Sequence, residues 1–560
     1  MALLLPTLAA TNSMLAATRP NLVYILNDDT DVMLGSPVSG ALHQTRSLLA
    51  DGGAEFTQFR TLSPKCTPSR AGQLVGRHYH NVRPVAAETA MVEVLEDGTT
   101  VAPQGGGLNQ TTMFEPTALF PMLKAAGYWT SIVGKVHNSQ GGWLCKPGHN
   151  RTDAFTHIST VCGPCGNYFP DEFVVKEVGE PTTRLVKAKD PTDYAAVYSH
   201  GQYSNRSTAF MRQAVAAGAP FFAHIGTTGP HLPSLPAPWH AARVDAWKNA
   251  ATDPNATAAP RTPNFNGHYA DHHPTIAALP PIDADKLHFV DEHMRDRLGT
   301  MLSIDDLVAA VVATLDELRV LERSYVLFSS DHGYHLGQWR LPMEKMWPYE
   351  TDCRIPFYIR GPGIAPGTKL DVLGVNMDIA PTLLSLAGVT VPRNYDGRSL
   401  LPLLLAGAAD DDEARAAAAA AAAASSWRTR TVISFAEGAF QNWGQYPFPP
   451  WPANATDPTA TRHAPSSSAS GGEYNFDNPS NQWRQLRVAN ATHNVSFVEW
   501  DPAFVFDTVA FAALWDVTAD PYQQHNLWPA LGEAERASWH AELDKEFACA
   551  GHHGRATDCS

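Results

Sequence analysis

The sequence predicts an α/β fold with a large, mostly parallel sheet sandwiched by helices, followed by a smaller domain with an antiparallel sheet. Between about residues 20 and 405, short apolar runs alternate with helical patterns, which is typical of parallel strands joined by helices. The 560 residues are 44% hydrophobic, so the chain can bury a large core and is neither disordered nor collagen-like. Between about residues 429 and 530, strand-like runs and turn signals occur without long helices, which indicates the antiparallel unit.

The individual elements can be placed from their apolar runs. We expect strands at residues 22–26, 129–133, 221–225 and 325–328, and helices at residues 117–126, 304–321 and 379–387. An acidic patch and nine consecutive alanines then form a low-complexity stretch with no apolar face to bury. The predicted division is a candidate signal peptide (1–17), a large α/β domain (18–407), a linker or insertion (408–428) and a smaller α+β domain (429–560).

The N-terminus and the sequons indicate the secretory pathway. Residues 1–17 are apolar and uncharged, as in a shortened signal peptide, but the positive n-region is missing, so a buried or disordered arm remains an alternative. Seven Asn-X-Ser/Thr sequons occur where chance gives about three, so we expect N-glycans and a secreted, cell-wall or lysosome-like location.

The net charge of −15 without a basic stripe argues against nucleic acid as a partner. No apolar run approaches the roughly 20 residues of a membrane span.

Charged and polar side chains follow four of the predicted strands. In open α/β sheets, ligands bind beyond the carboxyl ends of the parallel strands, so these side chains are expected to meet at one edge. Paired carboxylates suit Ca²⁺ or Mg²⁺, although an isolated pair is more often a turn with a helix cap, and a mixed carboxylate and imidazole set does not identify the metal. The residues in strand order are Asp28 and Asp29, then Lys135 and His137, then His231, and finally Asp331 and His332.

Cys66 lies in the string Lys-Cys-Thr-Pro-Ser-Arg, which ends at Arg70 and is followed by AGQLVGRH. Pro68 suits a first helical turn and would place Cys66 at the positive end of a helix. That position is expected to lower the pKa of a thiol and to attract anions. The chain has seven cysteines, so one stands outside any set of disulfides, and a buried structural thiol is the alternative interpretation of Cys66.

CTPSR with the downstream LVGR resembles the signature of the formylglycine-dependent sulfatases of the alkaline-phosphatase superfamily. The resemblance spans residues 19–527 in family order, through RPNLVYILNDD, GYWTSIVGKVHN, GPHLPSLPAP, SDHGYHLGQW, EKMWPYETDCRIPFYIRGPG, MDIAPTLLSLAG, DGRSLLPLL and LWDVTADPYQQHNL. The HxPxxPAP string and SDHGYHLGQW are most similar to the arylsulfatase and N-acetylglucosamine-6-sulfatase branch. The resemblance implies an alkaline-phosphatase-like fold and hydrolysis of sulfate esters, either aryl sulfates or sulfated sugars.

The resemblance also implies a role for each of these residues. One divalent cation, usually calcium, would be held by Asp28, Asp29, Asp331, His332 and the side chain of Cys66 after its oxidation to formylglycine (3-oxoalanine). Some relatives have Asn where this chain has His332, which makes that ligand the least secure. A formylglycine-generating enzyme would be the maturation partner. Arg70 and Lys135 would stabilise the formylglycine hydrate, His137 would act on it as a base, His231 would protonate the leaving alcohol, and Lys345 would bind the sulfate.

Two other functions are compatible with the same fold. A phosphatase or phosphodiesterase would keep the metal carboxylates but would not need the C-x-P-S-R string. A catalytically silent glycan-binding relative would be expected to have lost Cys66, Arg70, Lys135 or a metal carboxylate, and all of these are present. Asp31 is interpreted as a turn residue rather than a further ligand. His268, His272 and His273 are interpreted as residues of a solvated loop rather than metal ligands.

Overall fold

The computed structural model describes residues 19–82, 93–94, 100–101, 114–137, 152–161, 167–249, 258–406, 427–436, 480–490, 492–551 and 559. The candidate signal peptide (1–17), most of the stretch at 408–428, and Cys145, Cys162 and Cys165 lie outside these residues. Predictions that concern them stay predictions, as does the proposed division into domains.

Within the described residues, ten strands form one large sheet in the order β12-β2-β11-β10-β1-β9-β5-β6-β7-β8. The central strands β10, β1, β9, β5 and β6 pair in parallel, while β11 and the pairs beyond β6 are antiparallel. The strands are β1 (Asn21–Asn27), β2 (Ala54–Arg60), β5 (Trp129–Gly134), β6 (His157–Val161), β7 (Glu172–Lys176), β8 (Arg184–Lys187), β9 (Phe221–Gly226), β10 (Ser324–Ser330), β11 (Phe357–Arg360) and β12 (Thr368–Val375). The predicted fold class is confirmed.

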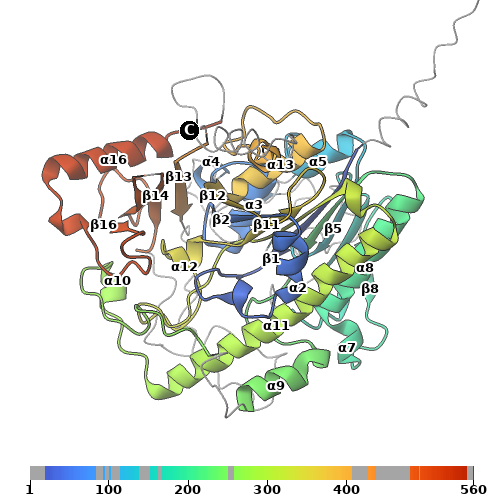
Figure 1. Ribbon diagram of the computed structural model, residues 1–560, viewed down its shortest axis with the longest axis horizontal. Coiled ribbons are helices and arrows are strands. Elements are labelled where there is room, and N and C mark those ends of the chain that lie inside the picture. Colours follow the sequence, from blue (N-terminus) through green and yellow to red (C-terminus); the bar gives the residue numbers. More distant parts are fainter. Residues whose placement is uncertain are drawn as a thin grey trace, which may run out of the picture.

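Helices cover both faces of this sheet (Figure 1). The long helices α8 and α11 cross one face, and α3, α5 and α13 cover the other. The helices are α2 (His43–Thr45), α3 (Cys66–Val75), α4 (Tyr79–Val82), α5 (Leu119–Ala125), α7 (Tyr194–Val197), α8 (Ser199–Ala216), α9 (Ala241–Asn249), α10 (Pro274–Ala277), α11 (Ala284–Glu317), α12 (Glu350–Cys353), α13 (Ile379–Leu386), α14 (Leu401–Leu405) and α16 (Glu533–Phe547). Shorter helical turns are η1 (Ser36–Val38), η2 (Arg46–Asp51), η4 (Pro238–His240), η5 (Leu321–Arg323), η6 (Asn376–Asp378) and η7 (Trp528–Ala530).

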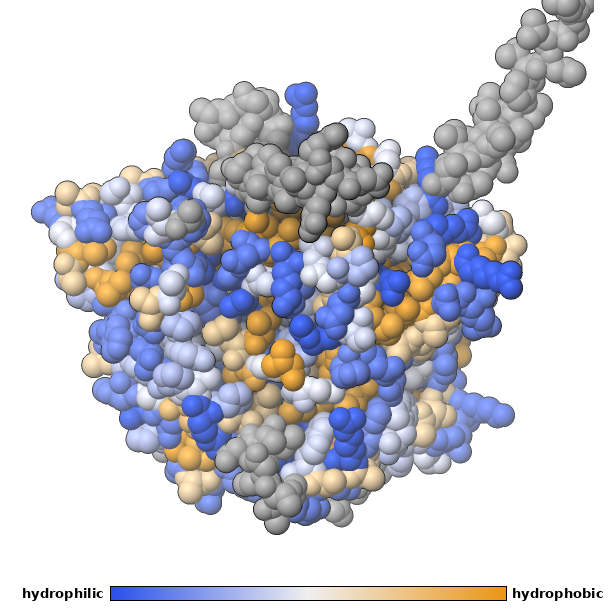
Figure 2. Space-filling view, in the orientation of Figure 1, coloured by the Kyte–Doolittle hydropathy of each residue, from blue (hydrophilic) through white to orange (hydrophobic). Residues whose placement is uncertain are grey.

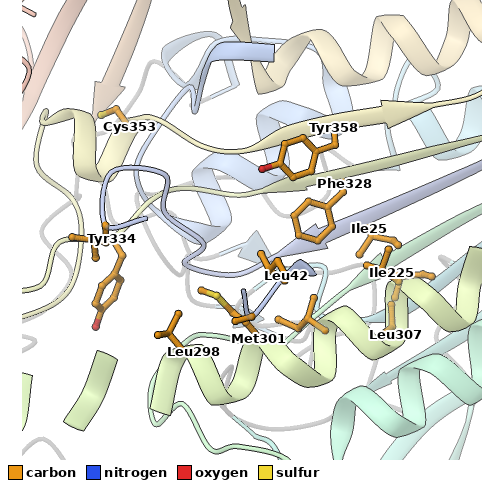
Figure 3. Packing of buried hydrophobic residues seen from close by; sticks show 14 of the residues in the cluster. Ile25, Leu42, Ile225, Leu298, Met301, Leu307, Phe328, Tyr334, Cys353 and Tyr358 are labelled. Atoms are coloured by element: carbon orange, nitrogen blue, oxygen red, sulfur yellow. The ribbon is translucent and has the colours of Figure 1, made fainter. Parts of the chain in front are cut away.

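The core between α11 and the sheet is made of aliphatic and aromatic side chains. Figure 3 shows Leu298, Met301 and Leu307 of α11 on the side of the helix that faces Ile25 and Phe328 of the sheet. All five of these side chains are buried. On the face of the molecule in Figure 2, hydrophilic residues are spread widely, with smaller apolar patches between them. Most of the large apolar side chains are therefore buried inside the protein, as expected for a large globular core.

Helix α11 differs from its prediction, because it begins 20 residues before the expected start at residue 304. The N-terminal half carries many charged residues, which hid its helical periodicity, and yet Arg295, Asp296 and Arg297 are buried there. Among the described residues, α11 is the one helix long and apolar enough to cross a membrane, but most of its most apolar stretch is buried inside the protein. A core helix of a globular protein has these properties.

A smaller antiparallel sheet follows in the order β13-β14-β15-β16, as predicted, and lies beside the large sheet with α16 against it (Figure 1). Its strands are β13 (Arg430–Phe435), β14 (Trp483–Ala489), β15 (Asn494–Trp500) and β16 (Phe511–Asp516), and a separate two-stranded ribbon pairs β3 (Glu93–Val94) with β4 (Thr100–Val101). A disulfide joins Cys549 to Cys559 after α16. The interpretation of a solvated loop holds for His268, which is exposed. It is wrong for His272 and His273, because both are buried among aromatic rings, including Trp347 and Trp515.

Candidate active site

The carboxyl ends of the central parallel strands bring the predicted side chains to one edge of the sheet. Asp28 and Asp29 follow β1 directly, and Asp331 follows β10, the parallel neighbour of β1. The two segments are tied together, because the Asp29 N–H donates to Oδ1 of Asp331 at 3.2 Å and the Thr30 N–H donates to Oγ of Ser330 at 2.9 Å. Buried backbone groups need such partners, so the carboxylates are held where the strands end.

Cys66 is the first residue of α3, as predicted, and its side chain is buried. Lys65 is its extended N-cap, and the helix ends at Gly76, whose φ of 61° suits the left-handed cap. The Cys66 Sγ lies 3.5 Å from Oδ1 of Asp28 and 3.3 Å from Nε2 of His332. The expectation of a lowered thiol pKa is wrong, because burial, followed by the Asp28 carboxylate, raises the pKa of Cys66 to about 12. The unmodified side chain is thus a protonated thiol rather than a nucleophilic thiolate.

Arg70, one helical turn after Cys66, connects three segments of the site. Its Nε donates to Oδ2 of Asp331 at 2.8 Å, its Nη1 donates to the carbonyl of Lys135 at 2.9 Å, and its Nη2 donates to the carbonyl of Asn27 at 3.3 Å. The guanidinium is buried, so its positive charge is shielded from water. Only an arginine offers enough donors in one plane to serve three acceptors in this way.

Two lysines neutralise the carboxylates that follow β1. Lys135 pairs with Oδ2 of Asp28, and the Nζ of Lys345 lies 2.9 Å from Oδ1 of Asp29. Burial alone would raise the pKa of Asp28, but Lys135, with His231 and Arg70, outweighs it and holds that pKa well below its usual range. Burial would also raise the pKa of Asp29, but Lys345 and His231 outweigh this effect and lower that pKa to about 2. Both carboxyls are therefore ionised at neutral pH.

Four candidate ligands lie within 4.8 Å of one another, namely Asp28, Cys66, Asp331 and His332, and all four are buried. Asp29 is not part of this set, but its Oδ1 lies 3.4 Å from Nδ1 of His332. The carboxylate oxygens suit a hard cation such as Ca²⁺. The thiol does not, whereas an oxygen in its place would complete a set of hard ligands, so the residues fit calcium if position 66 carries oxygen.

The two histidines of the proposed proton transfers have different surroundings. His231 is partly exposed, and its Nδ1 lies 2.7 Å from the carbonyl of Leu232, so Nδ1 carries the proton and Nε2 is left for a ligand. Partial burial, followed by the Lys345 ammonium, lowers the pKa of His231. His137 is buried after β5, where burial, with Arg70 and Lys135, lowers its pKa to about 3. His137 is thus neutral at neutral pH, and its lowered pKa makes it a weak base.

The sequence did not reveal several buried residues that support this site. The hydroxyl of Ser69 donates to the carbonyl of Asp331 at 2.5 Å, and Nδ2 of Asn376 donates to Oγ of Ser69 at 2.9 Å. The Tyr168 hydroxyl donates to the carbonyl of His231 at 2.7 Å, and Arg297 reaches the backbone of Asp29. Apart from the Tyr168 contact, which spans 63 residues, these contacts join segments 262 to 307 residues apart. Ser69 lies in the Cys-Thr-Pro-Ser-Arg string, but nothing in that string points to its contact with Asp331.

The comparisons with known proteins agree with this arrangement. A family model described as Sulfatase matches residues 20–389. The chain is 28% identical to the N-acetylglucosamine-6-sulfatase of Capra hircus over 95% of this chain and 84% of the relative. It is 30% identical to an arylsulfatase of Chlamydomonas reinhardtii over 66% of this chain and 56% of the relative. An extracellular sulfatase SULF-1 homolog of Drosophila melanogaster is 33% identical over 69% of this chain, which spans only 31% of that longer relative.

Two solved structures share the fold. One, a protein in complex with its substrate D-glucosamine-2-N,6-O-disulfate, has a TM-score of 0.61 and 19% identity, covering 94% of this chain and 96% of that chain. The other, a phosphonate monoester hydrolase from Silicibacter pomeroyi, has a TM-score of 0.59 and 19% identity, covering 94% of each chain. Such identities establish the fold, while the family model covers more than half of the sequence. The chain therefore belongs to the sulfatase family and to the sulfatase class of enzymes.

Proposed function

We propose that this sulfatase hydrolyses sulfate monoesters of aryl or sugar alcohols with a formylglycine hydrate formed from Cys66 and with one bound calcium ion. The observation that carries the proposal is the position of Cys66, whose Sγ is buried 3.5 Å from Oδ1 of Asp28. A protonated thiol is a poor nucleophile and a poor partner for a hard cation, whereas an oxygen at the same place would serve both purposes. The hydrate has two hydroxyls on one carbon, one to attack sulfur and one to expel sulfate afterwards.

The proposed calcium ligands are Asp28, Asp29, Asp331, His332 and the oxidised side chain of residue 66. A calcium ion bound there would polarise the sulfuryl oxygens and acidify the nucleophile. Asp29 would have to exchange its contact with Lys345 for the cation. Its inclusion is supported by the 3.4 Å separation of its Oδ1 from Nδ1 of His332. His332 is the member with the weakest support, because imidazole is a softer ligand than carboxylate.

The charges of the site's own residues favour a monoanion. Three carboxylates, those of Asp28, Asp29 and Asp331, are balanced by the cations Arg70, Lys135 and Lys345. The added charge of a divalent cation would leave the centre positive, which suits a sulfate ester that carries one negative charge. Because the whole chain has a net charge of −15, this local pocket, rather than the global field, would attract the substrate.

The proton transfers can be assigned to the two histidines. His231 is partly exposed and has Nε2 available, so we assign it to protonate the leaving alcohol. His137 lies after β5 and is assigned to accept a proton from the hydroxyl at position 66, although its lowered pKa makes it a weak base in the free site. Lys135 and Lys345 are assigned to bind the sulfate oxygens, and Arg70 to orient and stabilise the hydrate, in keeping with its position one turn along α3 from residue 66.

The relatives support the proposed substrate classes and location. N-acetylglucosamine-6-sulfatases and arylsulfatases are both among the relatives, so sulfated sugars and aryl sulfates are the two substrate classes to test. A relative named as extracellular supports a route through the secretory pathway, with N-glycans at the sequons. Oxidation of Cys66 would require a formylglycine-generating enzyme as maturation partner.

Mass spectrometry of the tryptic peptide Cys66–Arg70 tests the proposal. Active protein should show the mass deficit of an aldehyde in place of the thiol group. The Cys66→Ser variant should keep its fold but stall after one sulfuryl transfer, because the serine ester has no neighbouring hydroxyl to expel sulfate. Full turnover of sulfate esters by protein with unmodified Cys66, or repeated turnover by Cys66→Ser, would overturn the formylglycine assignment. Phosphoester substrates would then be the first to test.

A further inference from the structure

Asp29 has an unusual backbone conformation. Its φ is 60°, in the left-handed region that residues other than glycine seldom adopt. Asp and Asn tolerate this region better than most residues, but it still costs free energy that neighbouring contacts must offset. The preceding peptide is fixed, since the Asp28 N–H donates to the carbonyl of Gly229 at 3.1 Å and the Asp29 N–H donates to Asp331. Whether Asp29 keeps this conformation then depends on the contacts of its carbonyl and of the residues that follow it.

Those contacts come from Arg297 of α11. Its Nη2 donates to the carbonyl of Asp29 at 2.7 Å and to Oδ1 of Asp31 at 3.1 Å. The guanidinium is fully buried, and its central carbon lies 3.8 Å from the centre of the Tyr334 ring, within the range of a cation–π contact. One side chain therefore joins the two residues that flank Thr30, and it reaches them from a helix 266 residues further along the chain.

Asp31 is itself fixed by hydrogen bonds from the loop that follows it. Its Oδ2 accepts from the Leu34 N–H at 3.0 Å, and its Oδ1 accepts from the Ser36 hydroxyl at 2.6 Å. The interpretation of Asp31 as a turn residue agrees with these contacts. Since Asp31 cannot move freely, the Arg297 guanidinium is fixed as well. Asp29 is then held at its N–H by Asp331, which follows β10, and at its carbonyl by Arg297 of α11.

We propose that Arg297 is a positioning residue that holds Asp29 in its left-handed conformation and so sets the affinity of the site for calcium. The direction of the Asp29 side chain follows from its backbone torsions, because the backbone atoms bonded to Cα fix the direction of the Cα–Cβ bond. With φ near 60°, the carboxylate lies beside Lys345 and His332. Loss of the Arg297 contact would let the backbone relax to negative φ and turn the carboxylate away. This inference rests on the proposed calcium site, which Arg297 itself does not touch.

Titration of calcium into the purified full-length protein, after treatment with EDTA, tests the inference by isothermal calorimetry. Arg297→Lys keeps the charge but lacks the arginine's fork of donors, so it should weaken calcium binding by about tenfold or more, as residues that support metal ligands do. Arg295→Lys makes the same change two residues earlier on α11, where Arg295 pairs with Glu292 at 2.6 Å. That control should bind calcium as the wild type does.

The outcomes separate this inference from the proposed function. If wild type binds calcium and Arg297→Lys binds it equally well, Arg297 is not a positioning residue and the inference is wrong. If wild type binds no calcium, the metal assignment fails and the inference fails with it. Circular dichroism in EDTA checks the fold of each variant. If Arg297→Lys does not fold, Asp31→Asn takes its place, because it removes the counter-charge of Arg297. Weaker calcium binding by Asp31→Asn supports the inference, and unchanged binding overturns it.

Discussion

The Nε of Arg70 donates to Oδ2 of Asp331 at 2.8 Å, and both side chains are buried. This ion pair connects the helix that begins at Cys66 to the end of β10. The other two guanidinium nitrogens donate to the carbonyl of Lys135, just after β5, and to that of Asn27, the last residue of β1. One residue of α3 therefore fixes the ends of three strands. The catalytic helix and the carboxylate edge are therefore a single unit, and disturbance of either should affect both.

Replacement of Arg70 tests this coupling. Arg70→Ala leaves the buried Asp331 without its partner and should lower the free energy of unfolding by about 3–5 kcal/mol. Arg70→Lys keeps a positive charge, so it should unfold at a higher urea concentration than Arg70→Ala. It should nevertheless lose most activity, because an ammonium cannot serve three acceptors in fixed directions. Urea unfolding and sulfatase assays of both variants provide the measurement, and an Arg70→Lys enzyme with wild-type activity would contradict the coupling.

Removal of metal should show which carboxylates bind calcium. Saturating calcium should raise the unfolding free energy of wild type, by about 2.7 kcal/mol when the free ion is at 100 times its Kd. Asp28→Asn and Asp331→Asn should lose most of this gain while remaining folded in EDTA. Asp371→Asn, in an exposed part of β12, is a matched control that should keep it. Thermal or urea unfolding with and without calcium gives the answer, and equal gains in all four proteins would exclude Asp28 and Asp331 as ligands.

The edge of the sheet could be predicted because local patterns specify it. The strands at β1, β5, β9 and β10 are short apolar runs, and the residues that follow them are acids, histidines and a lysine, so the rule for parallel sheets placed them together. The start of α3 at Cys66 was likewise predicted from Pro68 in its first turn. In each case a few neighbouring residues carry the signal.

What could not be predicted depends on contacts between distant segments. Arg297 lies in a charged half of α11 whose helical periodicity is weak, and nothing in its surroundings in the sequence points to Asp29. The pKa of Cys66 depends on complete burial beside Asp28, which outweighs the helix terminus that suggested a lower value. His272 and His273 looked like loop residues in solvent because the tryptophans that cover them come from other parts of the chain.

Substrates with different leaving groups test the assignment of His231. Loss of a general acid typically costs about 10²–10⁴-fold in rate, and the loss grows as the leaving alkoxide becomes more basic. His231→Ala should therefore impair sugar sulfates much more than activated aryl sulfates. His240→Ala, in the helical turn η4 that follows and paired with Asp306 at 2.7 Å, is the control and should show no such dependence. A plot of log kcat/KM against leaving-group pKa is the measurement, and parallel plots for wild type and His231→Ala would make His231 a binding residue only.

Glu350 forms a buried ion cluster that joins the large sheet to the smaller one. It accepts from Nη2 of Arg60 in β2 at 2.6 Å and from Nε of Arg487 in β14 at 2.9 Å. Burial alone would raise the pKa of Glu350, but Arg60 and Arg487 outweigh it and lower the pKa from 4.5 to about 2. The unfolded chain thus takes up a proton near the usual value, while the folded chain does so only at much lower pH. The stabilisation is complete above about pH 4.5 and is lost as the pH falls towards 2.

The Glu350→Gln variant should reveal this pH dependence. At about pH 7 it should be less stable than wild type by about 3–5 kcal/mol, because two buried guanidinium groups lose their counter-charge. As the pH falls below about 4.5, wild type loses the contribution of ionised Glu350 and the variant does not, so the difference between them should shrink. Glu317→Gln removes an exposed partner of Arg212 and should have little effect at either pH. Urea unfolding across this pH range measures the difference, and a gap that stays constant down to about pH 3 would show that Glu350 does not titrate with folding.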